Sequence, residues 1–478
     1  MKKYEHAFGK NDIRGIYGDD ITEELFFHIG RAFVKWLELQ SGKGVMYITV
    51  TIDARMHSPS LRDALNEGIT STGAHVINLG LAPTPIGYYS EVVMDDVIAA
   101  AIITASHNPK EYNGLKLTYN KTTLDEEQIA EVKGLVGALW SDNSFFIRSS
   151  NGIQKELSDQ SFYDIFTDYI AEMKAQFDNI GKGIKVVVDS ANATGGVIAP
   201  QVYREIGCEV IELFSEPDGT FPNHHPNPSD LKTLEALQKA VVEHKADLGI
   251  AFDGDGDRIG VVDAAGCPIP GDMLLLIYAL ELEVPNPTVV CEVKCSQIVF
   301  DTINALGGNA VMSKTGHGYV KAKMRETKAV FGGEMSGHTF FKDRYYGFDD
   351  AIYAGCRLIE IVAKHKNANP NFKIQDILKP YDKGFSSSEL RYPVPNERKK
   401  EVMEKFRALV EADKNLFGSP IKEIITLDGM RILFNNGFAL IRQSNTEPVF
   451  TLRFEAETKQ ACERLHNTMI NELEKILK

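Results

Sequence analysis

The segment Asp253-Gly-Asp-Gly-Asp257 sets three carboxylates at alternate positions, and Arg258 follows it. Glycine tolerates tight backbone turns, so these carboxylates can converge on one point. Clustered carboxylates repel one another unless a hard cation neutralises them. The EF-hand pattern is excluded, because its required glycine would fall on Arg258 and its final glutamate on Ala264. Three ligands leave positions open for a phosphate, so the spacing predicts a magnesium site of Asp253, Asp255 and Asp257 rather than a solvated acidic turn.

Ser106 occupies a short polar stretch, TASHNP, that could present its hydroxyl on a tight turn. His107 could accept the serine proton or orient a phosphate, and Lys116 further along would add positive charge to the loop. The lipase-type nucleophile elbow is excluded, because the positions that need glycine hold Thr104 and Asn108. Acyl transfer is therefore disfavoured. Taken alone, the stretch is equally typical of a capped turn.

A third loop, GEMSGH, carries the acid Glu334, the hydroxyl of Ser336 and the imidazole of His338 between glycines. A sugar edge needs such a mixture of donors and acceptors on a backbone that can approach closely. The alternative is an ordinary polar turn.

A fourth loop, RQSNTEP, lies between two strand-like runs and carries Arg442, Ser444, Asn445 and Thr446. One guanidinium, two hydroxyls, an amide and free backbone N–H groups suit a phosphate. Arg453, on the following strand, could lean toward this loop or cover the sheet.

Four basic residues lie on loops that follow predicted strands: Arg14, Arg55, Lys294 and His317. Each by itself is more often a surface charge. Their positions at strand ends make them candidates for binding an anionic substrate.

Apolar runs lead into the two loops with the clearest chemistry. Val97–Thr104 ends at the serine loop, and Leu248–Phe252, which follows a charged helix predicted over Asp230–His244, ends at the aspartate loop. Uninterrupted apolar runs are typical of buried parallel strands. Open α/β sheets bind ligands at the carboxyl ends of such strands.

A helix-like segment that ends at glycine and precedes a short strand occurs three times. The segments begin at Leu61, Ala199 and Phe300, and their glycines are Gly73, Gly207 and Gly308. Each glycine suits a left-handed helix C-cap. The strand-like runs before the helices are Val45–Thr51, Ile184–Asp189 and Thr288–Val293. These units predict parallel sheets in three related α/β domains, with one large sheet as the alternative.

From about Lys373 the pattern changes to alternating strands, LDGMRILF, GFALIRQ and VFTLRFEA, and an amphipathic helix begins near Lys459. This order predicts a C-terminal α+β domain with antiparallel pairing.

Size and composition limit the classes of protein. A chain of 478 residues is too long for one core, and 43% hydrophobic with 25% charged residues excludes intrinsic disorder. A formal charge of −14 without a basic run opposes nucleic-acid binding. The two N-terminal lysines precede no apolar stretch, and the most apolar run, Val97–Ala105, is far short of the roughly 18 residues of a membrane span. The six cysteines lack metal-site spacing and are expected to be reduced thiols, so a cytoplasmic location is expected.

Together the four loops resemble those of the α-D-phosphohexomutase superfamily, over nearly the whole chain. TASHNP resembles the phosphoserine loop, DGDGDR the metal loop, GEMSGH the sugar-binding loop and RQSNTEP the phosphate-binding loop. Met335, Lys294 and FPNHHPNP (residues 221–228) are similar to the phosphomannomutase/phosphoglucomutase branch. Asn11 and Ile52 depart from it, where tyrosine and arginine are expected.

The resemblance implies three related mixed α/β domains plus a C-terminal α+β domain around a central cleft. The expected ranges are 1–150 (phosphoserine loop), 151–258 (metal loop), 259–370 (sugar-binding loop) and 371–478 (phosphate-binding loop). It also implies an intramolecular phosphotransferase, an isomerase of carbohydrate metabolism that interconverts hexose 1-phosphate and hexose 6-phosphate of mannose, glucose or both.

The implied mechanism uses a phosphoserine and a hexose 1,6-bisphosphate intermediate, with a bisphosphate activator. Ser106 would carry the phosphoryl group and, with the three aspartates, hold one Mg²⁺; Arg258 and Lys116 would stabilise charge, and His107 or Lys116 would move the sugar proton. The substrate-binding residues would be Arg14, Lys294, His317, Glu334, Ser336, His338, Arg442, Ser444, Asn445 and Thr446. A monomer or homodimer that binds neither nucleic acid nor membrane is expected.

The alternatives are a phosphoglucosamine or phosphopentose mutase of the same family, a metal-dependent sugar phosphatase, and a sugar-phosphate sensor without catalysis. Closure of the last domain over the substrate is expected, because water must be kept from the phosphoserine.

Overall fold

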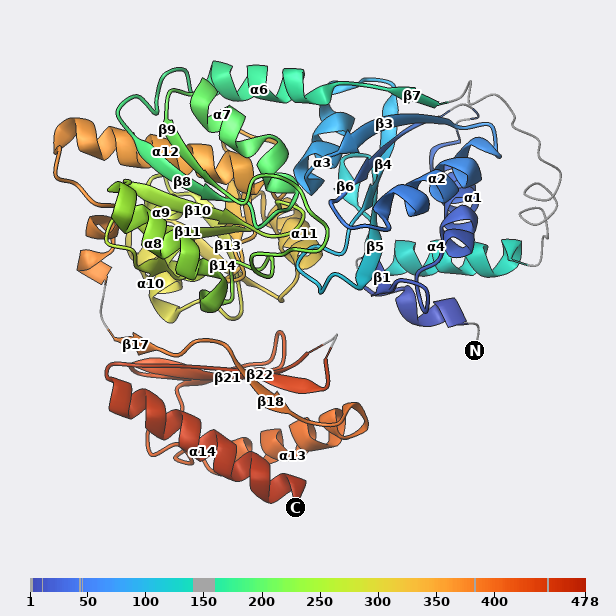
Figure 1. The fold of residues 1–478 in the computed structure, drawn as a ribbon. Coiled ribbons are helices and arrows are strands. Elements are labelled where there is room, and N and C mark those ends of the chain that lie inside the picture. The colour runs from blue at the N-terminus through green and yellow to red at the C-terminus, as the bar shows by residue number, and fades with distance from the viewer. Residues whose placement is uncertain are drawn as a thin grey trace. The chain divides into compact units, whose positions relative to one another are not determined.

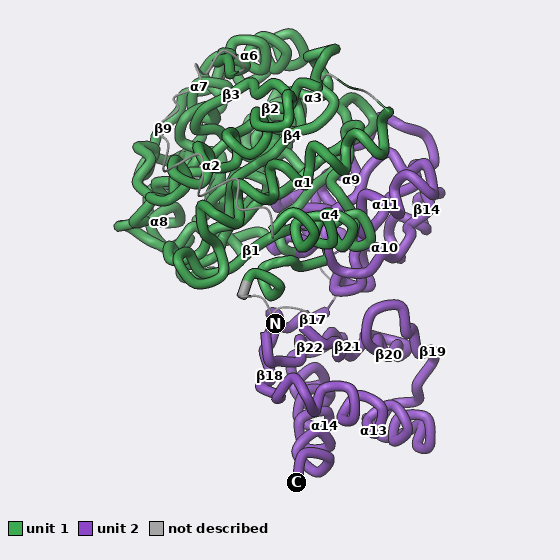
Figure 2. The backbone as a smooth tube through the Cα atoms, turned by 90° about the vertical axis from the view of Figure 1, so that its right-hand side faces the viewer, with its two compact units in different colours: residues 1–269, 336–374 green, residues 270–335, 375–478 purple. Residues whose placement is uncertain are grey.

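The structure is a computed structural model that describes residues 3–10, 12–42, 44, 46–140, 160–381, 384–444 and 447–478 (Figure 1). The chain divides into two compact units, shown in two colours in Figure 2. Unit 1 holds residues 1–269 and 336–374, and unit 2 holds residues 270–335 and 375–478. The described residues form four sheets.

The first sheet, in unit 1, positions the serine loop. Its strands run in the order β1-β5-β4-β2-β3-β7, and β6 pairs with β5. The central strands β2, β3 and β4 are parallel, whereas β5 is antiparallel to β4. The strands are β1 (Ile13–Ile16), β2 (Tyr47–Ile52), β3 (His75–Leu81), β4 (Val97–Ile103), β5 (Tyr112–Tyr119), β6 (Thr122–Thr123) and β7 (Gln160–Phe162). The helices are α1 (Glu23–Ser41), α2 (Ser58–Thr70), α3 (Thr84–Val93) and α4 (Glu126–Leu139).

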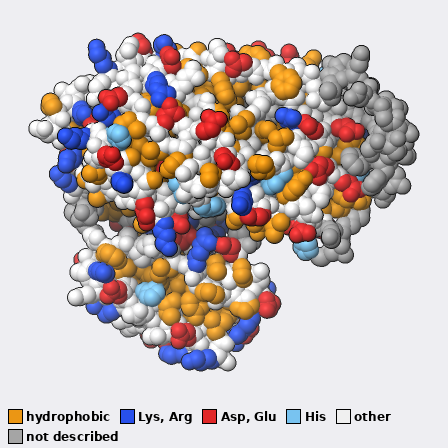
Figure 3. All heavy atoms as spheres, in the orientation of Figure 1, with side chains coloured by type: hydrophobic (Ala, Val, Ile, Leu, Met, Phe, Trp, Pro, Cys, Tyr) orange, Lys and Arg blue, Asp and Glu red, His pale blue; other side chains and the backbone are white. Residues whose placement is uncertain are grey.

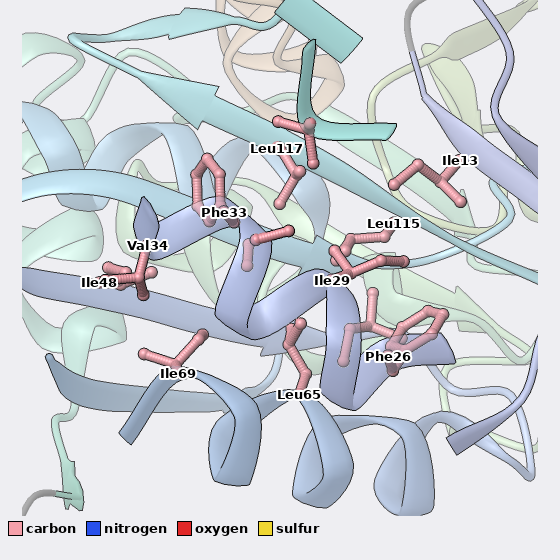
Figure 4. Packing of buried hydrophobic residues seen from close by; sticks show 14 of the residues in the cluster. Ile13, Phe26, Ile29, Phe33, Val34, Ile48, Leu65, Ile69, Leu115 and Leu117 are labelled. Carbon is pink, nitrogen blue, oxygen red and sulfur yellow. The ribbon is translucent and has the colours of Figure 1, made fainter. Parts of the chain in front are cut away.

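Helix α1 organises the core beside this sheet. It begins where the Thr22 hydroxyl accepts a hydrogen bond from the N–H of Leu25, and it ends at Gly42, whose φ of 68° is left-handed. Figure 4 shows side chains of α1 and α2 gathered with residues of β2 and β5, among them Phe33, Leu65 and Leu117. Full burial of each large apolar side chain contributes roughly 1.5–3 kcal/mol.

The second sheet, also in unit 1, positions the aspartate loop. Its order is β12-β11-β10-β8-β9; strands β8, β9 and β10 are parallel, and β11 is antiparallel to β10. The strands are β8 (Lys185–Asp189), β9 (Glu209–Leu213), β10 (Leu248–Phe252), β11 (Ile259–Asp263) and β12 (Pro268–Ile269). Unit 1 also contains α6 (Ile165–Gln176), α7 (Ala199–Glu205), α8 (Glu235–His244), α12 (Ala351–Ala368) and strand β16 (Thr339–Phe341).

Unit 2 contains a parallel group of strands and an antiparallel sheet. In the parallel group, β13 (Thr288–Glu292) lies between β14 (Asn309–Ser313) and β15 (Phe331–Gly333). Its helices are α9 (Gly271–Leu280), α10 (Gln297–Ala305) and α11 (His317–Thr327).

The antiparallel sheet follows the order β17-β22-β21-β20-β19, and β18 pairs with β22. Its strands are β17 (Phe385–Ser386), β18 (Leu390–Pro393), β19 (Glu423–Ile425), β20 (Met430–Phe434), β21 (Gly437–Gln443) and β22 (Val449–Ala456). Apolar side chains of α13 (Lys399–Ala412) and α14 (Lys459–Leu477) pack with it in one core cluster.

The expected fold class, related mixed α/β domains followed by a C-terminal α+β domain, is confirmed, and the alternative of one large sheet is wrong. The central cleft stays a prediction. One repeat detail is also wrong. Gly73 and Gly207 have left-handed φ angles of 94° and 102°, but in the third repeat the left-handed residue is Gly307, with a φ of 89°, and not Gly308. The chain turns one residue earlier there, because Leu306 already closes α10.

The surface agrees with the composition. On the face drawn in Figure 3, basic and acidic side chains are interspersed among the coloured residues. None of the helices in the described ranges is both long and apolar enough to cross a bilayer. All six cysteines are unpaired, as predicted, and only Cys267 is exposed.

Glu91, in α3, yields a prediction about stability. Its buried carboxyl accepts hydrogen bonds from the Thr118 hydroxyl and the Lys121 N–H. Burial nevertheless raises the pKa of Glu91 to about 7, because these bonds offset only part of the desolvation cost. In the unfolded chain the carboxyl ionises near 4.5, so the folded state binds more protons between the two values. The stability that Glu91 contributes is therefore lost as pH rises through this window.

We compare the free energy of unfolding of Glu91→Gln with that of the wild type. As the pH rises from about 4.5 to 8, we expect this difference to shift in favour of the variant by up to about 3 kcal/mol. Urea titrations across this range measure the difference. Glu127→Gln, at an exposed position in the first turn of α4, is the matched control. A difference between Glu91→Gln and wild type that does not change with pH would contradict the prediction.

Candidate active site

The serine loop and the aspartate loop meet in unit 1. Strand β4 ends at Ile103, and Ser106 follows with a left-handed φ of 49°, which is uncommon for a residue with a Cβ. Ser106 is 2% exposed, and its Oγ donates a hydrogen bond of 2.7 Å to Oδ2 of Asp253. Asp253 directly follows β10. Ser106 and Asp253 thus follow the carboxyl ends of β4 and β10, strands that belong to different sheets, and the serine hydroxyl contacts the carboxylate there.

The aspartate loop is held by its own backbone and by α3. Oδ1 of Asp253 accepts from the N–H groups of Asp257 and Arg258, both at 3.2 Å. Thr84, at the start of α3, donates its hydroxyl to Oδ2 of Asp255 (2.6 Å) and its N–H to the Asp255 carbonyl (2.7 Å). These contacts fix the direction of the carboxylates.

Lys116 supplies positive charge inside this cluster. It lies on β5 opposite Ile102 of β4 and is 2% exposed. Its Nζ donates to Oδ2 of Asp255 (2.7 Å) and Oδ2 of Asp257 (2.5 Å). Burial by itself would lower the pKa of Lys116, but the two carboxylates outweigh it and raise that pKa well above its ordinary value. Lys116 is therefore a fixed cation at neutral pH.

The three aspartates fit a hard cation. One oxygen from each carboxylate lies within 4.8 Å of the others, and all three residues are buried. Within the described ranges, Oδ1 of Asp255 and Oδ1 of Asp257 are buried and accept no hydrogen bond. Unsatisfied buried oxygens are costly, and an oxygen-only donor set suits magnesium or calcium.

The electrostatics of the triad point the same way. Burial, together with the negative charges of Asp257 and Asp255, raises the pKa of Asp253 well above its ordinary value. Burial also acts to raise the pKa of Asp257, but the positive charge of Lys116, with a smaller contribution from Arg258, helps to outweigh it, and that pKa is lowered. The protein's own cations thus balance part of the negative charge, and an added cation would relieve the remainder.

His107 and Arg258 extend the site from the other side of Ser106. Nδ1 of His107 lies 3.1 Å from Ser106 Oγ, and its Nε2 lies 3.5 Å from NH1 of Arg258. Burial, followed by the charge of Arg258, lowers the pKa of His107 well below its ordinary value, so the ring is neutral at neutral pH. A guanidinium can only donate, so Nε2 accepts and Nδ1 carries the proton toward Ser106.

His338 belongs to this cluster as well. Nε of Arg258 donates to Nε2 of His338 (2.9 Å), and Nδ1 of His338 lies 3.0 Å from Asp349 and 3.7 Å from Asp257. The sequence predicted His338 as a sugar ligand on GEMSGH. The structure places it against the aspartate loop, where its position also orients Arg258.

Arg14 and Arg55, both singled out as basic residues on loops, contact the serine loop. NH1 of Arg14 donates to the side chain of Asn108 (2.8 Å). Arg55 is 1% exposed and donates to carbonyl oxygens of the serine loop, including that of Ser106. The expectation that each by itself is more often a surface charge is wrong for Arg55.

Unit 2 brings Lys294 among acidic groups. Lys294 follows β13, and its Nζ lies 2.8 Å from Glu389 and 3.6 Å from Glu292. Burial would lower its pKa, but Glu292 and Glu389 outweigh this effect and raise it. Glu292 is fully buried and accepts the N–H of Met335 (2.7 Å), so it anchors the start of the GEMS segment.

Glu334 and His317 are also brought together in unit 2. Glu334 is 3% exposed and accepts the N–H of Gly316 (2.5 Å), the residue before His317 at the start of α11. Ser336 belongs to unit 1, where its carbonyl accepts the Ser229 hydroxyl (3.0 Å).

The last loop is anchored by partners the sequence did not reveal. Nε of Arg442 donates to Oδ2 of Asp428 (3.1 Å), which also accepts the Thr315 N–H (3.0 Å). The carbonyl of Ser444 accepts from Nζ of Lys399 (2.9 Å). Asn445 and Thr446 lie outside the described residues, as does Asn11.

The sequence also predicts that Arg453 leans toward this loop or covers the sheet. Instead it is buried, pairs with Asp272 (2.8 Å) and donates to the carbonyl of Lys294. Strand alternation predicts the face of the sheet on which Arg453 lies, but it does not predict a partner that is distant in the sequence. The only sign of a buried ion pair was an arginine within an otherwise apolar strand.

Several functional candidates carried no motif. Thr84, Asp349 and Glu389 contact predicted site residues but are separated from them in sequence. Glu292 alone had a signal, because it precedes Lys294 by two residues at a strand end.

Comparisons with known proteins match this arrangement along the chain. Models of the phosphoglucomutase/phosphomannomutase alpha/beta/alpha domains I, II and III match residues 5–139, 164–266 and 270–381, and the model of the C-terminal domain matches residues 389–472. A phosphomannomutase/phosphoglucomutase of Pseudomonas syringae pv. tomato is 38% identical over 471 residues, covering 98% of this chain and 95% of the relative. This chain belongs to the phosphoglucomutase/phosphomannomutase family.

Two further relatives agree with that assignment. A phosphoglucomutase of Neisseria gonorrhoeae is 36% identical and covers 96% of this chain and 95% of its own length. The solved structure of a phosphoglucomutase/phosphomannomutase family protein from Burkholderia thailandensis aligns with a TM-score of 0.84 at 33% identity, covering 98% of this chain and 97% of that one. The predicted family resemblance is confirmed.

The closeness of the two loops predicts the effect of one added carbon. A Cβ on Gly254 would lie 2.2 Å from the carbonyl oxygen of Ser106, a backbone atom that cannot step aside. We expect Gly254→Ala to push Ser106 away from Asp253 and to lower kcat at least tenfold. Steady-state mutase kinetics measure it.

Gly134→Ala, on α4, is the matched control, because its added Cβ would meet no atom within 4 Å. Wild-type kcat in Gly254→Ala would show that the serine loop tolerates displacement.

Proposed function

We propose that this chain is a phosphohexomutase that interconverts hexose 1-phosphate and hexose 6-phosphate through a phosphorylated Ser106. The observation that carries the proposal is the contact of Ser106 Oγ with Asp253 at the edge of a buried carboxylate triad. The family membership supports the same activity, and the relatives named for both mannose and glucose support those substrates.

In the proposed reaction the P–Oγ bond of phosphoserine 106 breaks as a sugar hydroxyl loses its proton and forms a new P–O bond. Ser106 Oγ takes up one proton, so the products are a hexose 1,6-bisphosphate and a free serine hydroxyl. The bisphosphate then turns so that its other phosphate faces Ser106, and the serine is rephosphorylated as the product forms. Phosphoryl transfer depends mainly on positioning and charge stabilisation. Lys116, which contacts Asp255 and Asp257, and Arg258, which lies beside His107, would supply positive charge to this step.

The chain's own groups are placed to handle the serine proton. His107 Nδ1 carries its proton toward Ser106 Oγ, so it stabilises the serine oxygen as the phosphoryl group leaves. Asp253 accepts the hydrogen bond of the free Ser106 hydroxyl, so it is placed to take that proton when the serine attacks the bisphosphate.

Asp253, Asp255 and Asp257 would hold Mg²⁺ together with the phosphoserine. When bound, Mg²⁺ would polarise the phosphoryl group and neutralise its charge. In unit 2 we propose that Lys294, Glu334 and His317 contact the sugar. Arg442 and Ser444, with Asn445 and Thr446, would hold the phosphate that does not react.

The phosphoserine has a direct test. Intact-mass spectra of the purified protein should show a fraction heavier by one phosphoryl group, and this fraction should disappear in Ser106→Ala together with mutase activity. Ser144→Ala provides a serine control on the same chain. An unmodified wild-type protein whose activity survives Ser106→Ala would refute the proposal.

The metal site can be tested without turnover. We expect Mg²⁺ to raise the Tm of the wild type, because it binds only the folded triad, and to leave the Tm of Asp255→Asn unchanged. Asp263→Asn is a matched control, since Asp263 is also buried but binds the N–H groups of Ala265 and Cys267. An equal Mg²⁺ shift in wild type and Asp255→Asn would contradict the assignment.

Substrate preference separates the mutases of the family. With Mg²⁺ and a bisphosphate activator, we expect mannose 1-phosphate and glucose 1-phosphate to turn over at least tenfold faster than glucosamine 1-phosphate. Coupled assays of the three 6-phosphate products measure this. Preference for glucosamine 1-phosphate would favour the phosphoglucosamine alternative, and release of free phosphate in step with substrate loss would favour a phosphatase.

A further inference from the structure

Both terminal nitrogens of the Arg55 guanidinium donate to backbone carbonyls of the loop that carries Ser106. NH2 donates to the carbonyls of Ser106 (2.9 Å) and Asn108 (2.6 Å), and NH1 donates to those of Pro109 (2.6 Å) and Tyr112 (3.0 Å). Nε donates to Oδ2 of Asp53 (3.0 Å). The planar fork of arginine can satisfy several acceptors at fixed angles, which a lysine ammonium cannot reproduce.

The acceptors are arranged around this one side chain. The carbonyls of Ser106, Asn108 and Pro109, which belong to one short loop, all accept hydrogen bonds from Arg55. Without the guanidinium, the buried carbonyl of Ser106 would lose this donor, at a cost of about 1–3 kcal/mol, and the part-buried carbonyls of Asn108 and Pro109 would lose theirs at a smaller cost. The loop would therefore move to find water or other donors.

The conformation that Arg55 holds is a strained one. Ser106 has a φ of 49°, a region in which a residue with a Cβ is disfavoured unless its surroundings impose it. Its carbonyl accepts from Arg55 and lies so close to Gly254 of the aspartate loop that a Cβ there would be 2.2 Å away. In this conformation Ser106 Oγ reaches Asp253.

Arg55 is itself fixed by several contacts. Asp53 accepts from Nε and from the N–H of Arg55, and its Oδ1 also accepts the Ser58 hydroxyl at 2.6 Å. The ring of Phe221, on a loop of the second sheet, lies 5.5 Å from the guanidinium carbon. Burial lowers the pKa of Arg55, but an arginine keeps its charge at neutral pH.

We propose that Arg55 is the positioning residue of the phosphoserine loop, and that it sets the rate of phosphoryl transfer without taking part in hexose phosphate binding. This inference rests on the proposed function of Ser106. Arg55 itself touches backbone carbonyls and Asp53, so it acts through the loop and is not a catalytic residue.

The test separates transfer from binding. In Arg55→Lys and Arg55→Ala we expect kcat to fall at least 100-fold, while the KM for hexose phosphate stays within about threefold of wild type. Phosphorylation of Ser106 by glucose 1,6-bisphosphate, followed by intact mass, should slow by the same factor as kcat. Arg62→Ala is the matched control, because Arg62 is a more exposed arginine, on α2, that pairs with its neighbour Asp63.

Chemical rescue adds a readout that a general loss of stability would not give. Guanidinium ion at about 10–50 mM should raise the kcat of Arg55→Ala at least tenfold, because it can occupy the space that the side chain leaves. Urea or sodium chloride at the same concentration should not raise it.

Wild-type kcat in both variants, or a raised KM with unchanged kcat, would overturn the inference. Loss of cooperative unfolding in both variants would also overturn it, because Arg55 would then be a folding residue. These results are distinguishable from failure of the proposed function, which would appear as mutase activity in Ser106→Ala.

Discussion

Mutual repulsion among three buried carboxylates is the constraint around which the site is organised. Asp253, Asp255 and Asp257 are each at most 1% exposed, so water cannot screen their charges. The nearest compensation is Lys116, whose buried ammonium contacts two of them. Arg258 lies 3.7 Å from Asp253 and adds a second positive charge. A divalent cation would complete this balance, and a phosphoryl group on Ser106 would in turn be drawn to it.

The groups that meet in this site come from two sheets. The acids come from the end of β10, Lys116 from β5 and Ser106 from the loop after β4. Glycine at position 254 and arginine at position 55 allow the two loops to approach, because one removes a side chain and the other satisfies carbonyls that have turned inward. Backbone geometry and charge thus determine the position of Ser106 together.

The sequence predicted the parts of this structure that local pattern controls. The aspartate loop was readable because alternating acids and glycines follow a buried strand, and the strands before and after each repeat were located to within a few residues. Ser106 was ambiguous alone, because TASHNP has the composition of an ordinary turn. Arg55 was misjudged as more often a surface charge, since its acceptors are backbone carbonyls that leave no trace in the sequence. Asp349 and Glu389 were not found, because their partners are brought close only by folding.

The central claim is that Ser106 gives its phosphoryl group to the sugar and not to water. Protein carrying a ³²P label on Ser106 can be mixed with unlabelled glucose 1-phosphate and quenched within a single turnover. The account predicts that the label leaves the protein and appears first in the 6-phosphate of glucose 1,6-bisphosphate. When the bisphosphate returns its unlabelled 1-phosphate to Ser106, the label then appears in glucose 6-phosphate within the same turnover. The account would be contradicted if the label appeared as inorganic phosphate as fast as it leaves the protein. It would also be contradicted if the label stayed on the protein while glucose 6-phosphate formed.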